Sequence, residues 1–130
     1  KLNIMREIKF RAWDKGKMRR VDSASFDKGK IRSMFEHDGF KYGADACYLI
    51  SEDAIVEQFT GLQDRNGVDI YEGDIMREHY GFDGVEFNYF EVCFGESLDT
   101  RIGWFLKGFT AVSNRESFSK LEVTGNIHQS

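Results

Sequence analysis

Residues able to do chemistry concentrate in one stretch, FTGLQDRNGVDIYEGDI at residues 59–75, which holds four acidic residues and one tyrosine. Within it, Glu72 and Asp74 stand two positions apart. In a strand this spacing places both carboxylates on one side, where they can act as general acid and general base. However, Gly73 separates them, and the run from Tyr71 to Asp74 is typical of a turn that leads into a strand. We therefore predict no catalytic residues in this stretch and no enzymatic activity for the chain.

The same stretch partly fits a calcium loop. If Asp64, Asn66 and Gly67 were the ligands and the tight turn of an EF-hand, Leu62 and Gly73 would occupy the places of its first and last carboxylates. Neither side chain can bind a cation. An Asn-Gly pair instead tolerates the positive φ of a hairpin loop, and a nearby aspartate caps such a turn. We interpret the stretch as a structural turn motif formed by Gly61, Asp64, Asn66, Gly67, Gly73 and Asp74.

Histidine and cysteine residues give no recognisable ligand set. His37, His79 and His128 are scattered along the sequence, and a surface or satisfied core position is favoured for each. Cys47 and Cys93 stand 46 positions apart, and neither has a histidine or a basic cluster nearby in the sequence. We therefore predict no metal and no cofactor in a reduced, cytosolic protein. No apolar run approaches the roughly 20 residues that a membrane-spanning helix needs, so we predict no membrane span.

The basic residues suggest another activity, nucleic-acid binding. Residues 1–32 carry 11 Lys/Arg against 4 Asp/Glu, whereas residues 33–130 carry 7 against 18. Trp13 is a candidate platform for stacking exposed bases, and Lys9 and Arg11 are candidates for steering phosphates. The alternative is that the basic segment folds back on the acidic remainder, within one chain or between subunits. Because the basic residues alternate with apolar ones, we favour this alternative.

Hydrophobic alternation predicts a mainly β fold of antiparallel strands. The chain has no proline, and its 12 Phe, 5 Tyr and 2 Trp favour pleated sheets. Ile8, Phe10 and Ala12 alternate with charged residues, which indicates a strand with one solvent-facing side. The sequence Asp-Lys-Gly-Lys occurs at 14–17 and again at 27–30, and both copies predict turns. Further strands are expected at 18–21, 74–80, 85–94, 102–109 and 121–127.

Three other segments carry less regular patterns. Residues 54–60 fit either a strand or one helical turn, and residues 33–53 give no clear pattern. Ser113 and Glu116 have the spacing of a capping box, which predicts a short helix over 114–120. The expected strand 85–94 is partly apolar on both faces, so we expect it to be covered on both sides, by sheet or by another subunit.

Three segments resemble a known family. MREIKFRAWD at 5–14, FTGLQDRNGVDIYEGDIM at 59–76 and EVTGNIHQ at 122–129 look like the three signatures of the YopX-type proteins of bacteriophages and prophages. They span nearly the whole chain in order, and every defined position of the central motif is filled. The segments between them, 33–53 and 96–118, match nothing recognisable. Such proteins normally begin at the position of Met5, so residues 1–4 are expected to be an upstream or added extension.

The resemblance implies a small, β-rich phage accessory protein with an SH3-like barrel in its C-terminal part and an unknown biochemical role. It implies that the turn motif bends the chain between sheet elements and that Ile70 and Ile75 enter the core. Tyr71 is expected to pack its ring and to leave its hydroxyl for a partner. We expect an N-terminal β-hairpin region over 5–58 to pack on a barrel region over 59–130, forming one compact unit.

The expected function follows from these points. We expect a non-enzymatic accessory protein in the cytoplasm of the bacterial host, which contacts a host or phage protein and forms a homo-oligomer. The alternative is a nucleic-acid-binding module that uses the basic N-terminal segment. The expected binding residues are Lys9, Arg11, Trp13 and Tyr71.

Overall fold

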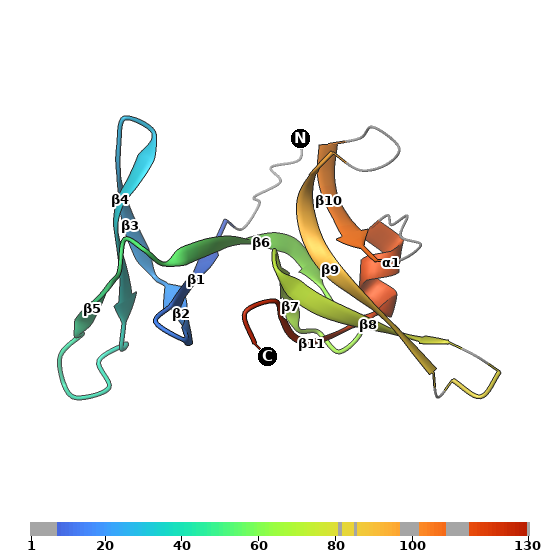
Figure 1. Cartoon of the computed structure of the whole chain (residues 1–130). Helices are drawn as coiled ribbons and strands as arrows, with labels where there is room; N and C mark the ends of the chain where they lie inside the picture. Colours follow the sequence, from blue (N-terminus) through green and yellow to red (C-terminus); the bar gives the residue numbers. More distant parts are fainter. Residues whose placement is uncertain (1–7, 81, 85, 97–101, 109–114, 130) are drawn as a thin grey trace, which may run out of the picture. The chain divides into compact units, whose positions relative to one another are not determined.

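The structure, a computed structural model, describes residues 8–80, 82–84, 86–96, 102–108 and 115–129. These residues form eleven strands and one short helix (Figure 1). All of the strand pairs are antiparallel. The expected mainly β, antiparallel fold is therefore confirmed. The chain divides into two compact units, one over Ile8–Gln58 and the other beginning, in the described residues, at Phe59.

The first unit contains two hairpins of the same design. Its complete strands are β1 (Phe10–Asp14), β2 (Lys17–Val21), β3 (Ser23–Asp27), β4 (Lys30–His37) and β5 (Cys47–Ile50). The β1–β2 turn has φ of 53° at Lys15 and 79° at Gly16, and the β3–β4 turn has 51° at Lys28 and 78° at Gly29. Two consecutive left-handed residues suit a hairpin, because their twist matches that of the strands. Both predicted Asp-Lys-Gly-Lys turns are confirmed.

The rest of the first unit was harder to predict. β5 lies in the segment that gave no clear pattern, and it extends the second hairpin into a sheet of order β3-β4-β5. β6 (Ile55–Gln63) pairs with β1 through Ile55–Gln58, so the strand alternative for 54–60 is confirmed. A small core fills this unit, with Ala12, Met34 and Ile50 buried at its centre.

The second unit contains the larger core. Its elements are the end of β6 with β7 (Asp69–Tyr71), β8 (Asp74–Tyr80), β9 (Glu86–Glu96), β10 (Ile102–Lys107), α1 (Arg115–Lys120) and β11 (Glu122–Asn126). β10, β9, β8 and β11 form one sheet in that order, curved like half a barrel (Figure 1). Phe118 of α1 packs with Met76 and Val92 of this sheet. The finer SH3-like assignment stays a prediction.

The short helix is where the sequence predicted it, although Ser113 and Asn114 of the capping box lie outside the described residues. Val85, the first residue of the predicted strand 85–94, also lies outside them. No helix in the described part of the chain has the length and apolar character needed to cross a membrane.

The predicted burial of Ile75 is wrong, whereas that of Ile70 is confirmed. Ile70 and Met76 have no exposed surface, and Ile75 is half-buried. Alternate residues of a strand point to opposite faces. Asp74 at the start of β8 is 1% exposed and accepts the main-chain N–H of Tyr71. Because Asp74 points inward, Met76 points inward as well and Ile75 faces the other side.

Candidate functional site

The turn motif begins with a loop held by one carboxylate. Asp64 Oδ1 accepts the main-chain N–H groups of Asn66 and Val68 at 2.8 and 2.9 Å. Asp64 Oδ2 accepts the N–H of Val123 in β11 at 2.9 Å, so the same side chain also ties the loop to the sheet. Gly67 completes the turn with a φ of 79° and donates to the carbonyl oxygen of Asp64 at 3.0 Å. The predicted cap is confirmed, and this carboxylate is used to hold the backbone.

The second half of the motif is built in the same way. Gly73 has a φ of 84°, donates to Val92 O and accepts from Ile127 N, both at 2.9 Å. Asp74 Oδ2 accepts Tyr71 N–H at 2.8 Å. A general acid or base must reach a substrate, and a carboxylate that is 1% exposed and bonded to its own turn is poorly placed to do so. Asp74 therefore has a structural role.

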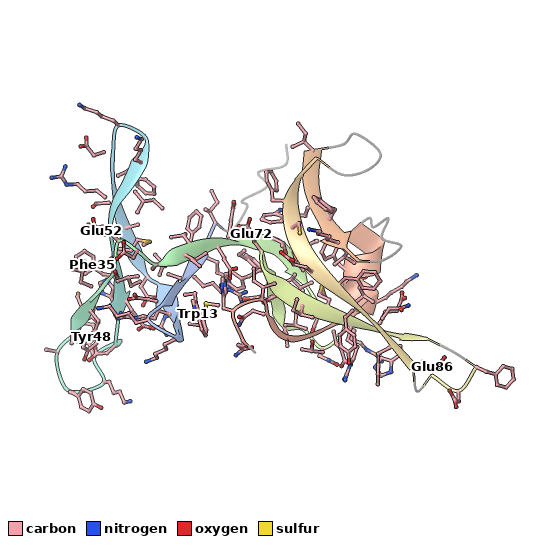
Figure 2. The ribbon with its side chains drawn as sticks, in the orientation of Figure 1. Trp13, Phe35, Tyr48, Glu52, Glu72 and Glu86 are labelled. Atoms are coloured by element: carbon pink, nitrogen blue, oxygen red, sulfur yellow. The ribbon has the colours of Figure 1, made fainter. Side chains whose placement is uncertain are left out.

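Gly61 and Tyr71 complete the set of predicted motif residues. Gly61 has a φ of 83° at an irregularity in the pairing of β6 with β7. The ring of Tyr71 packs against that of Phe59, with 5.5 Å between the ring centres. The predicted packing of the ring is confirmed, and a partner for the hydroxyl group stays a prediction. Glu72, the other half of the carboxylate pair, is half-buried directly after β7 (Figure 2).

The predicted nucleic-acid residues lie at β1 in the first unit. Arg11 Nε contacts Glu57 Oε1 at 2.9 Å, and the two side chains are only 14% and 4% exposed. Arg19 contacts Glu36 at 3.2 Å. Both arginines thus pair with acidic residues from beyond residue 32, as the fold-back alternative expects. Lys9 and Trp13 are half-buried, and Trp13 lies on β1 (Figure 2). Base stacking by Trp13 stays a prediction.

A surface that includes part of the predicted two-faced strand 85–94 lies on the outward face of β8, β9 and β11. We call it the outer patch, and it consists of Arg77, His79, Phe87, Tyr89 and Glu122. Arg77 lies opposite Tyr89 and also opposite Glu122, and His79 lies opposite Phe87, so all five side chains share one face. Phe87 and Tyr89 are 37% and 50% exposed. The other face of β9, with Phe90 and Val92, belongs to the core.

The side chains of the outer patch hold each other in place. Glu122 Oε1 accepts from Arg77 Nε at 2.6 Å and contacts His79 Nε2 at 3.0 Å. These two contacts, with Arg77 the stronger influence, hold the pKa of Glu122 below its usual value, and the same contact raises the pKa of Arg77. The guanidinium carbon of Arg77 lies 4.5 Å from the ring centre of Phe87, and His79 meets the same ring edge-on at 4.9 Å. The result is an ordered aromatic and charged surface.

Comparison with known proteins covers nearly the whole chain. A sequence model of the YopX protein family matches residues 9–130. The chain belongs to the YopX family. The resemblance seen in the three sequence signatures is therefore confirmed. A search of curated proteins found no significant match.

A solved structure extends the comparison to the fold of this YopX chain. It is similar to the crystal structure of protein EF1440 from Enterococcus faecalis, with a TM-score of 0.64 and 25% sequence identity. The match covers 94% of each chain. The two proteins therefore share their fold over nearly their whole length.

Cys47 of this YopX protein has no histidine nearby in the sequence, but the fold places one beside it. His37 at the end of β4 lies directly opposite Cys47 at the start of β5, and Cys47 Sγ is 3.5 Å from His37 Nδ1. Asp45 Oδ2 contacts the same nitrogen at 2.9 Å. Sequence reasoning missed this cluster because the pairing of β4 with β5 brings together residues ten positions apart. For Cys93 the prediction of an inert thiol agrees with the structure, since burial raises its pKa to about 11.

Proposed function

We propose that this protein is a non-enzymatic accessory protein of bacteriophages that acts through protein–protein contacts in the cytoplasm of the bacterial host. We further propose that it self-associates through the outer patch. The observation that carries the proposal is the exposure of Phe87 and Tyr89 beside a fixed arginine. Tyrosine, arginine and large aromatic side chains dominate the binding energy of protein interfaces. The finer SH3-like assignment of the curved sheet is part of the same proposal.

The contacts within the outer patch favour binding. Ordering a long side chain at an interface costs about 0.5–1.5 kcal/mol per residue. Arg77 is already held by Glu122 and lies over Phe87, so it has less freedom to lose when a partner binds. The ring of Tyr89 has few rotatable bonds and lies beside Phe87, with 6.3 Å between ring centres. A preordered patch of this kind gives more affinity per contact than a mobile one.

The proposed occupant of the outer patch is the β3–β4 hairpin of a second copy of this chain. Residues 59–130 carry 6 Lys/Arg against 12 Asp/Glu, and Glu91, two positions after Tyr89 on β9, lies on the same face as the outer patch. The β3–β4 hairpin presents the opposite character. Phe26 and Ile31 face each other across it and are 61% and 39% exposed. The exposed lysines of this hairpin are Lys28 and Lys30.

An apolar pair flanked by lysines therefore complements an aromatic patch with a glutamate beside it. The two surfaces are different parts of the chain, so each copy offers one of each. Such a contact either closes into a small ring or dimer or continues into an open assembly. The sedimentation experiment described next measures the size of the assembly.

Sedimentation velocity over a range of concentrations tests the proposal. Tyr89→Ser should weaken association by about tenfold or more, because it removes a central aromatic anchor. Lys30→Glu should weaken it several-fold, and Glu91→Lys combined with Lys30→Glu should restore it. Lys17→Glu is the matched control, because it makes the same charge change at an exposed residue of the β1–β2 hairpin. A monomer at every concentration, or equal losses in Lys17→Glu and Lys30→Glu, contradicts the proposed contact.

The nucleic-acid alternative is tested in parallel. If the basic segment binds single-stranded DNA or RNA, affinity must fall steeply with added salt, and Trp13→Ala must weaken it by about 1–3 kcal/mol. Tight binding with both properties, by a protein that stays monomeric, favours that alternative over self-association.

A further inference from the structure

Three donor atoms of different chemistry converge at the base of the β4–β5 hairpin. One ligand atom each of His37, Asp45 and Cys47 lie within 4.8 Å of one another. His37 Nδ1 is 2.9 Å from Asp45 Oδ2 and 3.5 Å from Cys47 Sγ. The pairing of β4 with β5 fixes this geometry, because His37 and Cys47 are direct cross-strand partners. A nitrogen, an oxygen and a sulfur donor thus point at one place.

The arrangement differs from that of a catalytic triad. In a triad the histidine uses one ring nitrogen for the nucleophile and the other for the orienting carboxylate. Here Cys47 and Asp45 both approach Nδ1, the sulfur lies farther from Nε2 at 3.9 Å, and Nε2 contacts Ser23 Oγ at 2.9 Å. Because Asp45 and Cys47 both approach the same ring nitrogen, they cannot relay a proton through the ring. They can, however, bind one ion together with that nitrogen.

Surrounding groups hold each donor in this position. The contact of Ser23 Oγ with Nε2 orients the imidazole so that Nδ1 faces Asp45 and Cys47. The main-chain N–H of Gly39 donates to Asp45 Oδ1 at 3.1 Å, which leaves Oδ2 directed at the cluster. The N–H of His37 donates to Asp22 Oδ2 at 2.8 Å. Ligand orientation by outer contacts of this kind is typical of metal sites in proteins.

A second observation in the same loop is a buried carboxylate oxygen of the residue that follows His37. Asp38 Oδ1 accepts the N–H groups of Phe40 and Ala46 at 3.0 Å each. Asp38 Oδ2 is buried, and among the described residues it is a side-chain oxygen without any hydrogen-bond partner. A buried, unpaired carboxylate oxygen is costly unless a positive charge lies nearby. His37 is the neighbouring residue, and Asp45 belongs to the same loop.

We propose that His37, Asp45 and Cys47 bind a divalent transition-metal ion of the zinc class. Zinc takes cysteine sulfur at about 2.3 Å and histidine nitrogen or carboxylate oxygen at about 2.0–2.2 Å, which places tetrahedral ligands about 3.3–3.6 Å apart. The separation of 3.5 Å between sulfur and nitrogen already fits. The nitrogen–oxygen separation of 2.9 Å is that of a hydrogen bond, and it lengthens when the ion replaces the shared proton.

Three protein ligands leave one tetrahedral position for water, since Cys47 is exposed and the side chains of His37 and Asp45 are 29% exposed. The bound ion closes the loop between β4 and β5. This loop carries Phe40 and Tyr42, which are 67% and 78% exposed, and Phe40 has a φ of 68°. A phenylalanine in the left-handed region is strained, and a metal clamp across the base of the loop stabilises it.

Titration of the full chain with CoCl₂, followed by displacement with ZnCl₂, tests the site. One Co²⁺ should bind per chain at micromolar concentration and give the near-ultraviolet band of a thiolate-to-cobalt bond. Cys47→Ser should abolish the band, and His37→Gln and Asp45→Asn should weaken binding by at least about tenfold. Ser23→Ala, which removes only the contact to Nε2, should weaken binding by about tenfold while the band remains. Cys93→Ser is the matched control and should bind as the original chain does.

Two outcomes overturn the proposal: no Co²⁺ or Zn²⁺ binding at micromolar concentration, or a thiolate band that survives Cys47→Ser or disappears in Cys93→Ser. Circular dichroism verifies that each variant folds. If Cys47→Ser does not fold, alkylation of the original chain decides instead. Bound Zn²⁺ must then slow the alkylation of Cys47 at least tenfold, and equal rates with and without Zn²⁺ refute the site.

Discussion

Replacing Asp64 offers the sharpest test of the structural interpretation of the turn motif. Its carboxylate accepts three main-chain N–H groups, from Asn66, Val68 and Val123. Asn66 and Val68 are exposed, so water can replace the carboxylate there, at roughly 0.5 kcal/mol each. Val123 is half-buried and packs against the core, so its N–H is left without a partner, at about 2 kcal/mol. Asp64→Ala should therefore lower the free energy of unfolding by about 3 kcal/mol.

Asp64→Asn separates the two contributions. Its amide oxygen can still accept from the turn, whereas its amide nitrogen meets the N–H of Val123, donor against donor. The expected loss is about 2 kcal/mol, which is the contribution of the Val123 bond alone. The roughly 1 kcal/mol between the two variants measures the turn bonds.

The assay is urea unfolding followed by tryptophan fluorescence in a Trp13→Phe background. Trp104 then reports only on the second unit, where it packs against the hydrophobic core. Glu78→Ala, an exposed carboxylate of the same unit, is the control and should change stability by less than about 0.5 kcal/mol. A loss below about 1 kcal/mol in Asp64→Ala, or none in Asp64→Asn, would refute the view that this carboxylate holds the fold.

Three further predictions concern single groups. Gly67 has a φ of 79° with open space around it, so Gly67→Val should lower the free energy of unfolding by about 1–3 kcal/mol through backbone strain alone. Gly103 is the control: it also has open space around it but no positive φ, so Gly103→Ala should not change stability measurably. The lowered pKa of Glu122 means that its contribution to stability is complete above the usual glutamate pKa of about 4.3 and is lost as the pH falls below that value. Glu122→Gln should therefore flatten the acid side of a curve of stability against pH. Iodoacetamide should modify exposed Cys47 at least tenfold faster than Cys93, whose pKa of about 11 leaves little thiolate at neutral pH, and equal rates would contradict the burial of Cys93.

Local patterns predicted the features that depend on neighbours in the sequence. The Asp-Lys-Gly-Lys turns, the strand at β1 and the turn role of Asp64 and Gly67 all follow from the conformational freedom of glycine and from short-range capping. The position of Met76 in the core was not predicted, because it depends on which way Asp74 points. That direction is set by a bond to Tyr71, and hydrophobicity alone cannot reveal it.

The contacts between strands within both candidate sites escaped prediction for a different reason. The outer patch unites residues of three strands, and Arg77 meets Glu122 only because β11 pairs with β8. The cluster of His37 and Cys47 likewise depends on the register of β5, a strand that lacks a clear sequence pattern. Strand register places residues side by side that stand far apart in the chain, and a single sequence contains little information about it.

The acidic residues of this protein mainly organise its backbone. The aspartates with a carboxylate that accepts a main-chain N–H are Asp14, Asp22, Asp38, Asp45, Asp64 and Asp74. Each such bond is charge-assisted, and such bonds are stronger than those between neutral groups. In a chain without proline, these carboxylates fix several of the described loops, which accounts for Asp64 and Asp74 of the central motif. Binding is better sought where aromatic rings stay exposed beside ordered charges, and Tyr89 next to Arg77 meets that description.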